Sequence, residues 1–244
     1  MKIYLNCMQC DPFSPHRYKK EVEYNEEGYY TIECPNGHKS FIILQEEKFE
    51  TLFQIGAHAI YDGYYREAVS SFTSSLERFY EFCVQLFCKK HNIEMDKIEK
   101  ACKFFTNSSE RQFGSFLFLY LIEFGELPFS FDEDTSNRNF RNGVIHKGKI
   151  PTKEEAIKYG DCIRKFILKT ELKLQKNYEK ELSELIFKNL SDKAKQNINN
   201  YPVVTMCQGN IISLANGEIE KSLEKSFVEE IESMKKQENG MKMH

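Results

Sequence analysis

The sequence predicts a mainly α-helical protein, in which a helical bundle follows a small β-rich module and precedes a tail made of a β-hairpin and a helix. Three observations support this fold class. Apolar residues recur every three or four positions through most of residues 46–190. Residues 1–45 instead contain three of the six prolines and short runs of aromatic and β-branched residues. From residue 191 to 244 the long helical pattern breaks, which marks a third region.

The N-terminal module, residues 1–45, contains two stretches typical of β-strands, "EVEYNEEGYYTIEC" and "KSFIILQ". It also contains two pairs of metal-ligand residues, Cys7-x2-Cys10 and Cys34-x3-His38. Zinc binds four such ligands as a tetrahedron, and two short turns that each supply two ligands are a common way to build it. The segment resembles a zinc ribbon. We therefore expect a structural Zn²⁺ on these four side chains.

Two alternatives to this zinc site remain open from the sequence. The cysteines could be free thiols in a loose segment, or His16 could replace His38 as the fourth ligand. The other five cysteines are scattered through helical sequence, where we expect them to be reduced and packed as small apolar groups.

The bulk composition favours a soluble, cytoplasmic protein. The chain has 244 residues, of which 41% are hydrophobic and 29% charged, as in ordinary globular proteins. Its start, "MKIYLNCMQC", lacks the apolar core of a secretory signal, and the most apolar stretch is broken by Glu123 and Glu126. We expect no membrane association. Because the formal net charge is −3, any contact with nucleic acid must come from a local basic patch.

Within residues 46–190, the apolar period predicts helices at 46–61, 94–105 and 109–125, and a long helix from about Tyr65 to Phe87. A further helix is expected after Pro151, because Thr152 and Glu155 have the spacing of a capping box. Its apolar stripe continues as far as Leu185. In the tail, "YPVVTMCQGNIISLANG" predicts a β-hairpin that turns near Gln208-Gly209-Asn210, and a charged helix is expected from Glu218 to Lys236.

The stretch "RNFRNGVIHK", residues 138–147, predicts a short helix. Thr135 or Ser136 can cap its start, and Gly148 and Pro151 are stop signals just beyond its end. It carries an Arg-x4-His pattern formed by Arg141 and His146. Asn142 and His146 are four residues apart and share a helix face, whereas Arg141 and His146 are about 140° apart around an ideal helix. A joint site therefore needs a long reach by Arg141, an irregular helix at Gly143, or a second copy of the chain.

A helical bundle that bears "RNGVIHKG", residues 141–148, resembles the HEPN superfamily over roughly residues 46–190. Many members are metal-independent endoribonucleases that act as toxins, abortive-infection proteins or antiviral effectors, and they dimerise so that two such motifs face one another. The resemblance implies an RNA substrate, a homodimer and a bacterial defence or toxin role, with a regulatory protein as a further possible partner. In one toxin subfamily a tyrosine two residues after the histidine is modified by AMP transfer. Gly148 occupies that position here, which argues against that form of control.

The residue types fit cleavage of RNA by attack of the ribose 2′-hydroxyl on the neighbouring phosphate, which leaves a 2′,3′-cyclic phosphate. In this interpretation His146 transfers protons, Arg141 holds the phosphate, and Asn142 orients His146 or contacts the phosphate. Two histidines related by a two-fold axis can act as base and acid in the same step, which gives a reason for a dimer. Lys147 and Lys149 would contact the RNA backbone, and no cofactor is expected for catalysis.

Glu77 and Arg78, on the long helix, are candidates for the border of this site. The alternative function is a non-catalytic HEPN-like module that binds nucleotide or RNA, or that serves for dimerisation.

Overall fold

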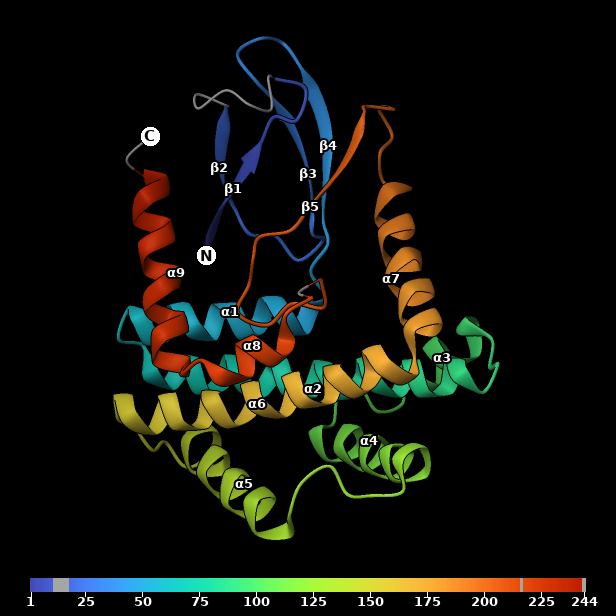
Figure 1. Ribbon diagram of the computed structural model, residues 1–244, viewed down its shortest axis with the longest axis vertical. Helices are drawn as coiled ribbons and strands as arrows, with labels where there is room; N and C mark the ends of the chain where they lie inside the picture. The colour runs from blue at the N-terminus through green and yellow to red at the C-terminus, as the bar shows by residue number, and fades with distance from the viewer. Residues whose placement is uncertain (11–17, 216, 243–244) are drawn as a thin grey trace.

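The computed structural model describes residues 1–10, 18–215 and 217–242. A β-rich module stands on one side of a layer of helices, and two further helices cover the opposite side of that layer (Figure 1). The chain is therefore mainly α-helical, as predicted. The described part of the chain begins and ends on the half of the molecule that holds the strands (Figure 1).

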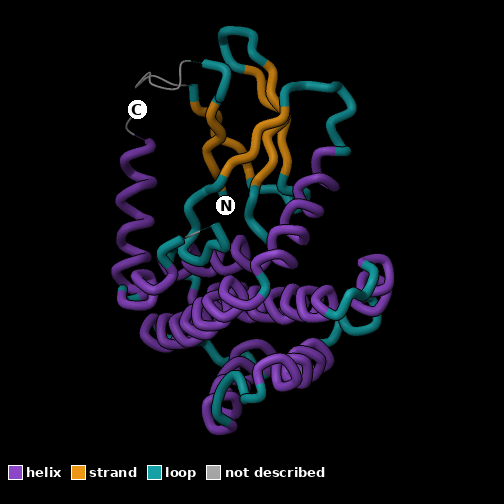
Figure 2. The backbone as a smooth tube through the Cα atoms, turned by 45° about the vertical axis from the view of Figure 1, so that its right-hand side comes forward, coloured by secondary structure: helices purple, strands orange, loops and turns teal. Residues whose placement is uncertain are grey.

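The strands form two small sheets, shown in orange in Figure 2. β1 and β2 pair antiparallel, β3 and β4 pair antiparallel, and β5 adds to β4 in parallel. The strands are β1 (Lys2–Asn6), β2 (Lys19–Glu23), β3 (Tyr29–Glu33), β4 (Lys39–Leu44) and β5 (Val203–Met206). The sequence predicted the regions of β2, β3 and β4 but not β1.

The predicted hairpin in the tail is wrong. Within the described residues its first half forms β5, which pairs with β4 of the N-terminal module, and its second half forms no strand. Val203 lies opposite Phe41 and Met206 lies opposite Leu44. A parallel partner far away in sequence satisfies the backbone groups that a local hairpin would otherwise pair.

The helices are α1 (Lys48–Tyr61), α2 (Tyr65–Lys90), α3 (Met95–Cys102), α4 (Ser109–Phe124), α5 (Phe131–His146), α6 (Lys153–Asn177), α7 (Glu179–Ala194), α8 (Ile219–Glu224) and α9 (Phe227–Lys242). The predictions for α1 to α4 are confirmed to within a few residues. So is the capping box of α6, where the Glu155 N–H donates to Thr152 Oγ1 at 3.2 Å and the Thr152 N–H donates to Glu155 Oε2 at 3.0 Å.

Three predicted helix boundaries need correction. α5 begins at Phe131, so the expected start at Thr135 or Ser136 is wrong. The apolar stripe after Pro151 is divided into α6 and α7 by Tyr178, whose backbone leaves the helical region at φ −136°. The charged helix of the tail is likewise divided into α8 and α9, because Lys225 is extended at φ −75°, ψ 145°. In these last two cases the apolar period continues across a local change of backbone direction, so periodicity alone does not reveal the break.

The bundle core is rich in phenylalanine and surrounds α2. Phe72 has no exposed surface and packs against Phe53 and Phe227, with ring centroids 4.8 and 5.8 Å away. Gly56 and Gly160 let α1 and α6 approach this ring, since a Cβ on either glycine would lie within 2.7 Å of it. Close packing of this kind fixes the relative positions of α1, α2 and α6.

Buried polar groups join the β-module and the tail to the bundle. The carboxyl group of Glu50 on α1 accepts the Leu214 backbone N–H at 2.6 Å, and the Lys193 ammonium donates to the carbonyl of Leu44 at 2.9 Å. Arg164 on α6 has no exposed surface and forms an ion pair with Glu230 of α9 at 2.8 Å. The C-terminal tail is therefore anchored to both the module and the bundle.

Candidate functional site

The four expected metal ligands, Cys7, Cys10, Cys34 and His38, come together at one end of the β-module. Their ligand atoms all lie within 4.8 Å of one another. The Cys10 Sγ atom is 3.7 Å from the Sγ of Cys34 and 3.5 Å from Nδ1 of His38, and the Cys7 Sγ is 3.8 Å from the same nitrogen. Zinc–sulfur bonds of about 2.3 Å in a tetrahedron place neighbouring sulfurs about 3.8 Å apart. The spacing of the cluster therefore fits a tetrahedral metal ion.

The local backbone explains why these ligands converge. Cys34 and His38 close a tight turn, in which the Gly37 N–H donates to the Cys34 carbonyl at 2.9 Å and Gly37 takes a left-handed φ of 77°. Gln9 joins the two ligand-bearing turns, since its amide donates to the Lys39 carbonyl at 2.7 Å. His16, the alternative fourth ligand, lies outside the described residues. The loose-thiol alternative does not match the burial of Cys7 and Cys34, which are 1% and 4% exposed.

The second candidate site lies on the other side of the bundle, around Arg141 on α5. The Arg141 guanidinium donates to Glu77 Oε1 on α2 at 2.9 Å and to Asn142 Oδ1 at 3.0 Å. Both side chains of the Arg141–Glu77 pair are about one-fifth exposed, so each charge is partly shielded from solvent. Burial raises the pKa of Glu77, and the Arg141 cation opposes that shift. Arg141 is thus held in a defined position, and Glu77 is the border residue that the sequence suggested.

The structure does not bring Arg141 and His146 together. They lie on one continuous helix, α5, in the separate orientations that helical geometry predicts. His146 is exposed in the last turn, and its side chain makes no hydrogen bond with any residue that the structure describes. Asn142 bonds to Arg141 and not to His146, so of its two expected roles the orientation of His146 is not observed.

The two lysines after His146 differ from each other. Lys147 is exposed and has no ion pair within the described part of the chain. Lys149 is paired with Glu155 at 2.6 Å and lies 4.8 Å from the ring centroid of Phe140. Its backbone N–H also donates to the Gly143 carbonyl at 3.0 Å, which helps to end α5. Lys147 is therefore the better placed of the two for contact with a phosphate backbone.

A cavity of about 670 Å³ opens beside Arg141, between α2, α4, α5 and α6. Arg141 and Asn142 line it, while His146 does not. Sequence reasoning missed this cavity, because its walls come from segments as far apart as Thr73 and Lys173. A signal was present in the sequence, since Lys165, Lys169 and Lys173 recur at intervals of four residues and so form a row on α6.

The chain matches no protein-family model, no curated protein and no solved structure. Among the residues that the structure describes, every helix is too short or too polar to span a membrane.

Proposed function

We propose that this protein is a metal-independent endoribonuclease of the HEPN type, in which two copies of the chain form one Arg-x4-His site. A role as a bacterial defence or toxin effector is part of the proposal. One observation carries it. Arg141 is fixed at the edge of a cavity rich in cationic side chains, and His146 remains accessible at the end of the same helix.

The chemistry assigns one role to each residue. The ribose 2′-oxygen forms a bond to phosphorus, and the bond from phosphorus to the 5′-oxygen of the next nucleotide breaks. One His146 accepts the proton of the 2′-hydroxyl, and the His146 of the other copy gives a proton to the leaving oxygen. Arg141 stabilises the additional negative charge on the phosphate through its planar set of donors.

The hydrogen bonds around Arg141 support its role. Glu77 and Asn142 hold the guanidinium from two sides, which reduces the rotamer entropy that Arg141 would lose on binding a phosphate. Lys147, adjacent to His146, would add a contact to the RNA backbone.

The separation of Arg141 and His146 on α5 is the reason to propose a dimer. A single straight helix presents the two side chains in different directions, about 140° apart. A two-fold axis that passes near the end of α5 would place the exposed His146 side chains of two copies in one cleft.

For the cysteine and histidine cluster we propose a structural Zn²⁺. All four positions are taken by protein side chains, which leaves no open position for substrate. Asn36 supports the cluster from outside, since its amide donates to Cys10 Sγ at 3.5 Å. Zinc would stabilise the β-module without taking part in RNA cleavage.

The test is cleavage of total RNA by the purified protein in EDTA. We expect products with 2′,3′-cyclic phosphate ends, and a loss of at least about a hundredfold in His146→Ala, in line with typical contributions of acid–base groups. Arg141→Lys should also lose most activity, because lysine keeps the charge but not the planar donors. Circular dichroism in the same buffer checks that removal of zinc has not unfolded the bundle. Cleavage that survives in His146→Ala would overturn the proposal.

The cavity also favours the second candidate, a non-catalytic module that binds nucleotide or RNA. If the protein is such a module, it should bind RNA without cleaving it, both in EDTA and with added metal ions. The same samples therefore separate the two functions, since a gel shift measures RNA binding and the cleavage products measure activity.

A further inference from the structure

The walls of the cavity beside Arg141 combine two kinds of chemistry. Aromatic rings of Tyr80, Phe113, Phe129 and Phe166 line it, and they form a connected group with centroids 5.5 to 6.0 Å apart. Cationic side chains outnumber acidic ones around it. The described cationic residues are Arg138, Arg141, Lys165, Lys169 and Lys173, and the described acidic residues are Glu77 and Glu110.

The cations are arranged along the cavity rather than in one cluster. Lys165, Lys169 and Lys173 span about 12 Å along one row of α6, at 1.5 Å per residue. Lys165 is paired with Asp161 at 2.7 Å, and Lys173 donates to the Tyr120 hydroxyl at 2.7 Å and to Glu126. Lys169 is exposed and has no ion pair among the described residues, so its charge is available to a ligand. The row favours a ligand with negative charge on one side.

The apolar part of the cavity favours a flat aromatic group. Phe113 and Phe129 are stacked with an interplanar angle of 14°, and Phe166 lies 5.5 Å from Phe129. Aromatic side chains of this kind bind nucleobases by stacking, which contributes about 1–3 kcal/mol per base. The Thr73 hydroxyl donates to the Val69 carbonyl at 2.8 Å and lies 2.9 Å from the Tyr159 hydroxyl, so these two oxygens in the cavity wall can accept hydrogen bonds from a ligand.

The size of the cavity agrees with this ligand. A volume of about 670 Å³ is within the range of about 300–1,000 Å³ found for sites that enclose small ligands. We infer that the cavity between α2, α4, α5 and α6 binds one nucleotide, with the base among the aromatic rings and the phosphate on Lys169, Arg138 and Arg141. This inference rests on the proposed function in one respect, since Arg141 is the phosphate ligand in both. It adds a base-binding subsite that would select the nucleotide next to the cleaved bond.

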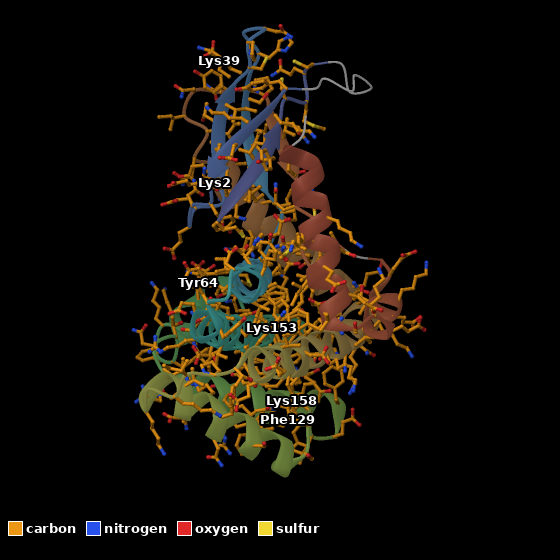
Figure 3. All side chains as sticks on the ribbon, turned by 90° about the vertical axis from the view of Figure 1, so that its left-hand side faces the viewer. Lys2, Lys39, Tyr64, Phe129, Lys153 and Lys158 are labelled. Atoms are coloured by element: carbon orange, nitrogen blue, oxygen red, sulfur yellow. The ribbon has the colours of Figure 1, made fainter. Side chains whose placement is uncertain are left out.

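The absence of tryptophan from the chain allows a direct test. Phe129→Trp places a single tryptophan in the cavity wall, on the side of the bundle away from the β-module (Figure 3). Phe118→Trp is the matched control, because Phe118 is on α4, is 67% exposed and does not line the cavity. Both are made in the His146→Ala background, so that binding is measured without cleavage.

We expect adenosine, guanosine, cytidine and uridine monophosphates to change the fluorescence of the Phe129→Trp chain in a saturable way, with different affinities for different bases. The Phe118→Trp chain should show no saturable change. Lys169→Glu should weaken binding by about tenfold or more, equal to about 1.4 kcal/mol. Lys158→Glu is its control, since Lys158 is also an exposed lysine of α6 but does not line the cavity.

Short oligoribonucleotides distinguish the two sources of this ligand. If the cavity serves the RNA chain, a trinucleotide with the preferred base binds more tightly than the mononucleotide and displaces it. If the cavity serves a free nucleotide, the mononucleotide binds more tightly and the trinucleotide does not displace it. Either result supports a nucleotide site. No saturable change with any mononucleotide or trinucleotide, or equal weakening by Lys169→Glu and Lys158→Glu, overturns it.

The two proposals fail in different ways. If the chain that retains His146 cleaves RNA but no nucleotide binds in the cavity, the nucleotide site is contradicted and the proposed endoribonuclease is not. If nucleotides bind in the cavity but the chain that retains His146 does not cleave RNA, the proposed endoribonuclease is contradicted and the nucleotide site is not.

Discussion

The metal-ligand cluster and the Arg-x4-His helix show opposite relations between distance in sequence and distance in space. Cys7 and His38 are 31 residues apart in sequence, yet their ligand atoms are 3.8 Å apart. Arg141 and His146 are five residues apart, yet only Arg141 lines the cavity. Tight turns bring distant ligands to one point, while a helix separates near neighbours around its axis. The difference suggests that the first site is complete within one chain and that the second needs another copy.

The largest effect is expected from loss of a metal ligand. Cys34→Ser should abolish stoichiometric zinc and unfold the strands of residues 2–44, because structural zinc supplies about 10–16 kcal/mol in small zinc modules. Metal analysis and a thermal melt measure both effects. Cys207→Ser is the control, since Cys207 is exposed and lies outside the cluster. Full zinc content in Cys34→Ser would show that the cluster is not the metal site.

A smaller effect is expected where helices of the bundle pack closely. Gly56→Ala places a Cβ 2.5 Å from the Phe72 ring, which is fully buried, and should reduce the free energy of unfolding by about 1–3 kcal/mol. Gly114→Ala on α4 meets no atom within 4 Å and should increase it by about 0.5–1 kcal/mol. Denaturant unfolding of both variants tests whether packing, and not metal, holds this half of the molecule. Equal effects from the two substitutions would contradict that account.

The stability of the junction between the bundle and the β-module with its tail should depend on pH. Burial raises the pKa of Glu50 to about 8, against about 4.5 in the unfolded chain, so the folded state holds this proton more tightly. The contribution of Glu50 to stability is therefore complete below pH 4.5 and is lost as pH rises towards 8, at up to about 1.4 kcal/mol per pH unit.

Glu50→Gln removes this titration, while burial still raises the pKa of the neighbouring Glu171. Between pH 5 and 8 the unfolding free energy of the wild type should fall relative to that of Glu50→Gln. The free energy of unfolding is measured by urea denaturation at each pH. If it changes with pH equally in the two chains, Glu50 does not keep its proton in the folded state.

The smallest effect on stability is expected at His146, since it is exposed and has no partner among the described residues. His146→Ala should change the free energy of unfolding by no more than about 0.5 kcal/mol. Arg141→Ala should cost more, about 1 kcal/mol, because it leaves the partly buried Glu77 without its cation. A thermal melt of both variants measures their stability. In a variant whose stability is unchanged, a loss of RNA cleavage can be assigned to the missing side chain and not to unfolding.

Local signals in the sequence were sufficient for most helices, for the ligand set of the metal cluster and for the end of α5. A metal-binding turn is recognised from its ligand residues and the turn residues between them. A helix is recognised from its capping residue and its apolar period. Both signals lie within a few neighbouring positions of the sequence. The pairing of β5 with β4 was not predictable in this way, since the partners are about 160 residues apart. The cavity was missed for the same reason. The pairing of Lys149 with Glu155 was not predicted either, because the sequence assigns Glu155 to the capping box of α6 and does not show that Lys149 folds back onto it.

The central claim is that two His146 side chains, one from each copy, share one reaction. Wild-type and His146→Ala chains, mixed in varying ratio and allowed to exchange, test it through the rate of RNA cleavage at constant total protein. An equal mixture forms about one quarter wild-type dimers, so we predict that about one quarter of the wild-type rate remains. A rate of one half, linear in the fraction of wild-type chain, would mean that each chain cleaves RNA alone, and it would contradict the account.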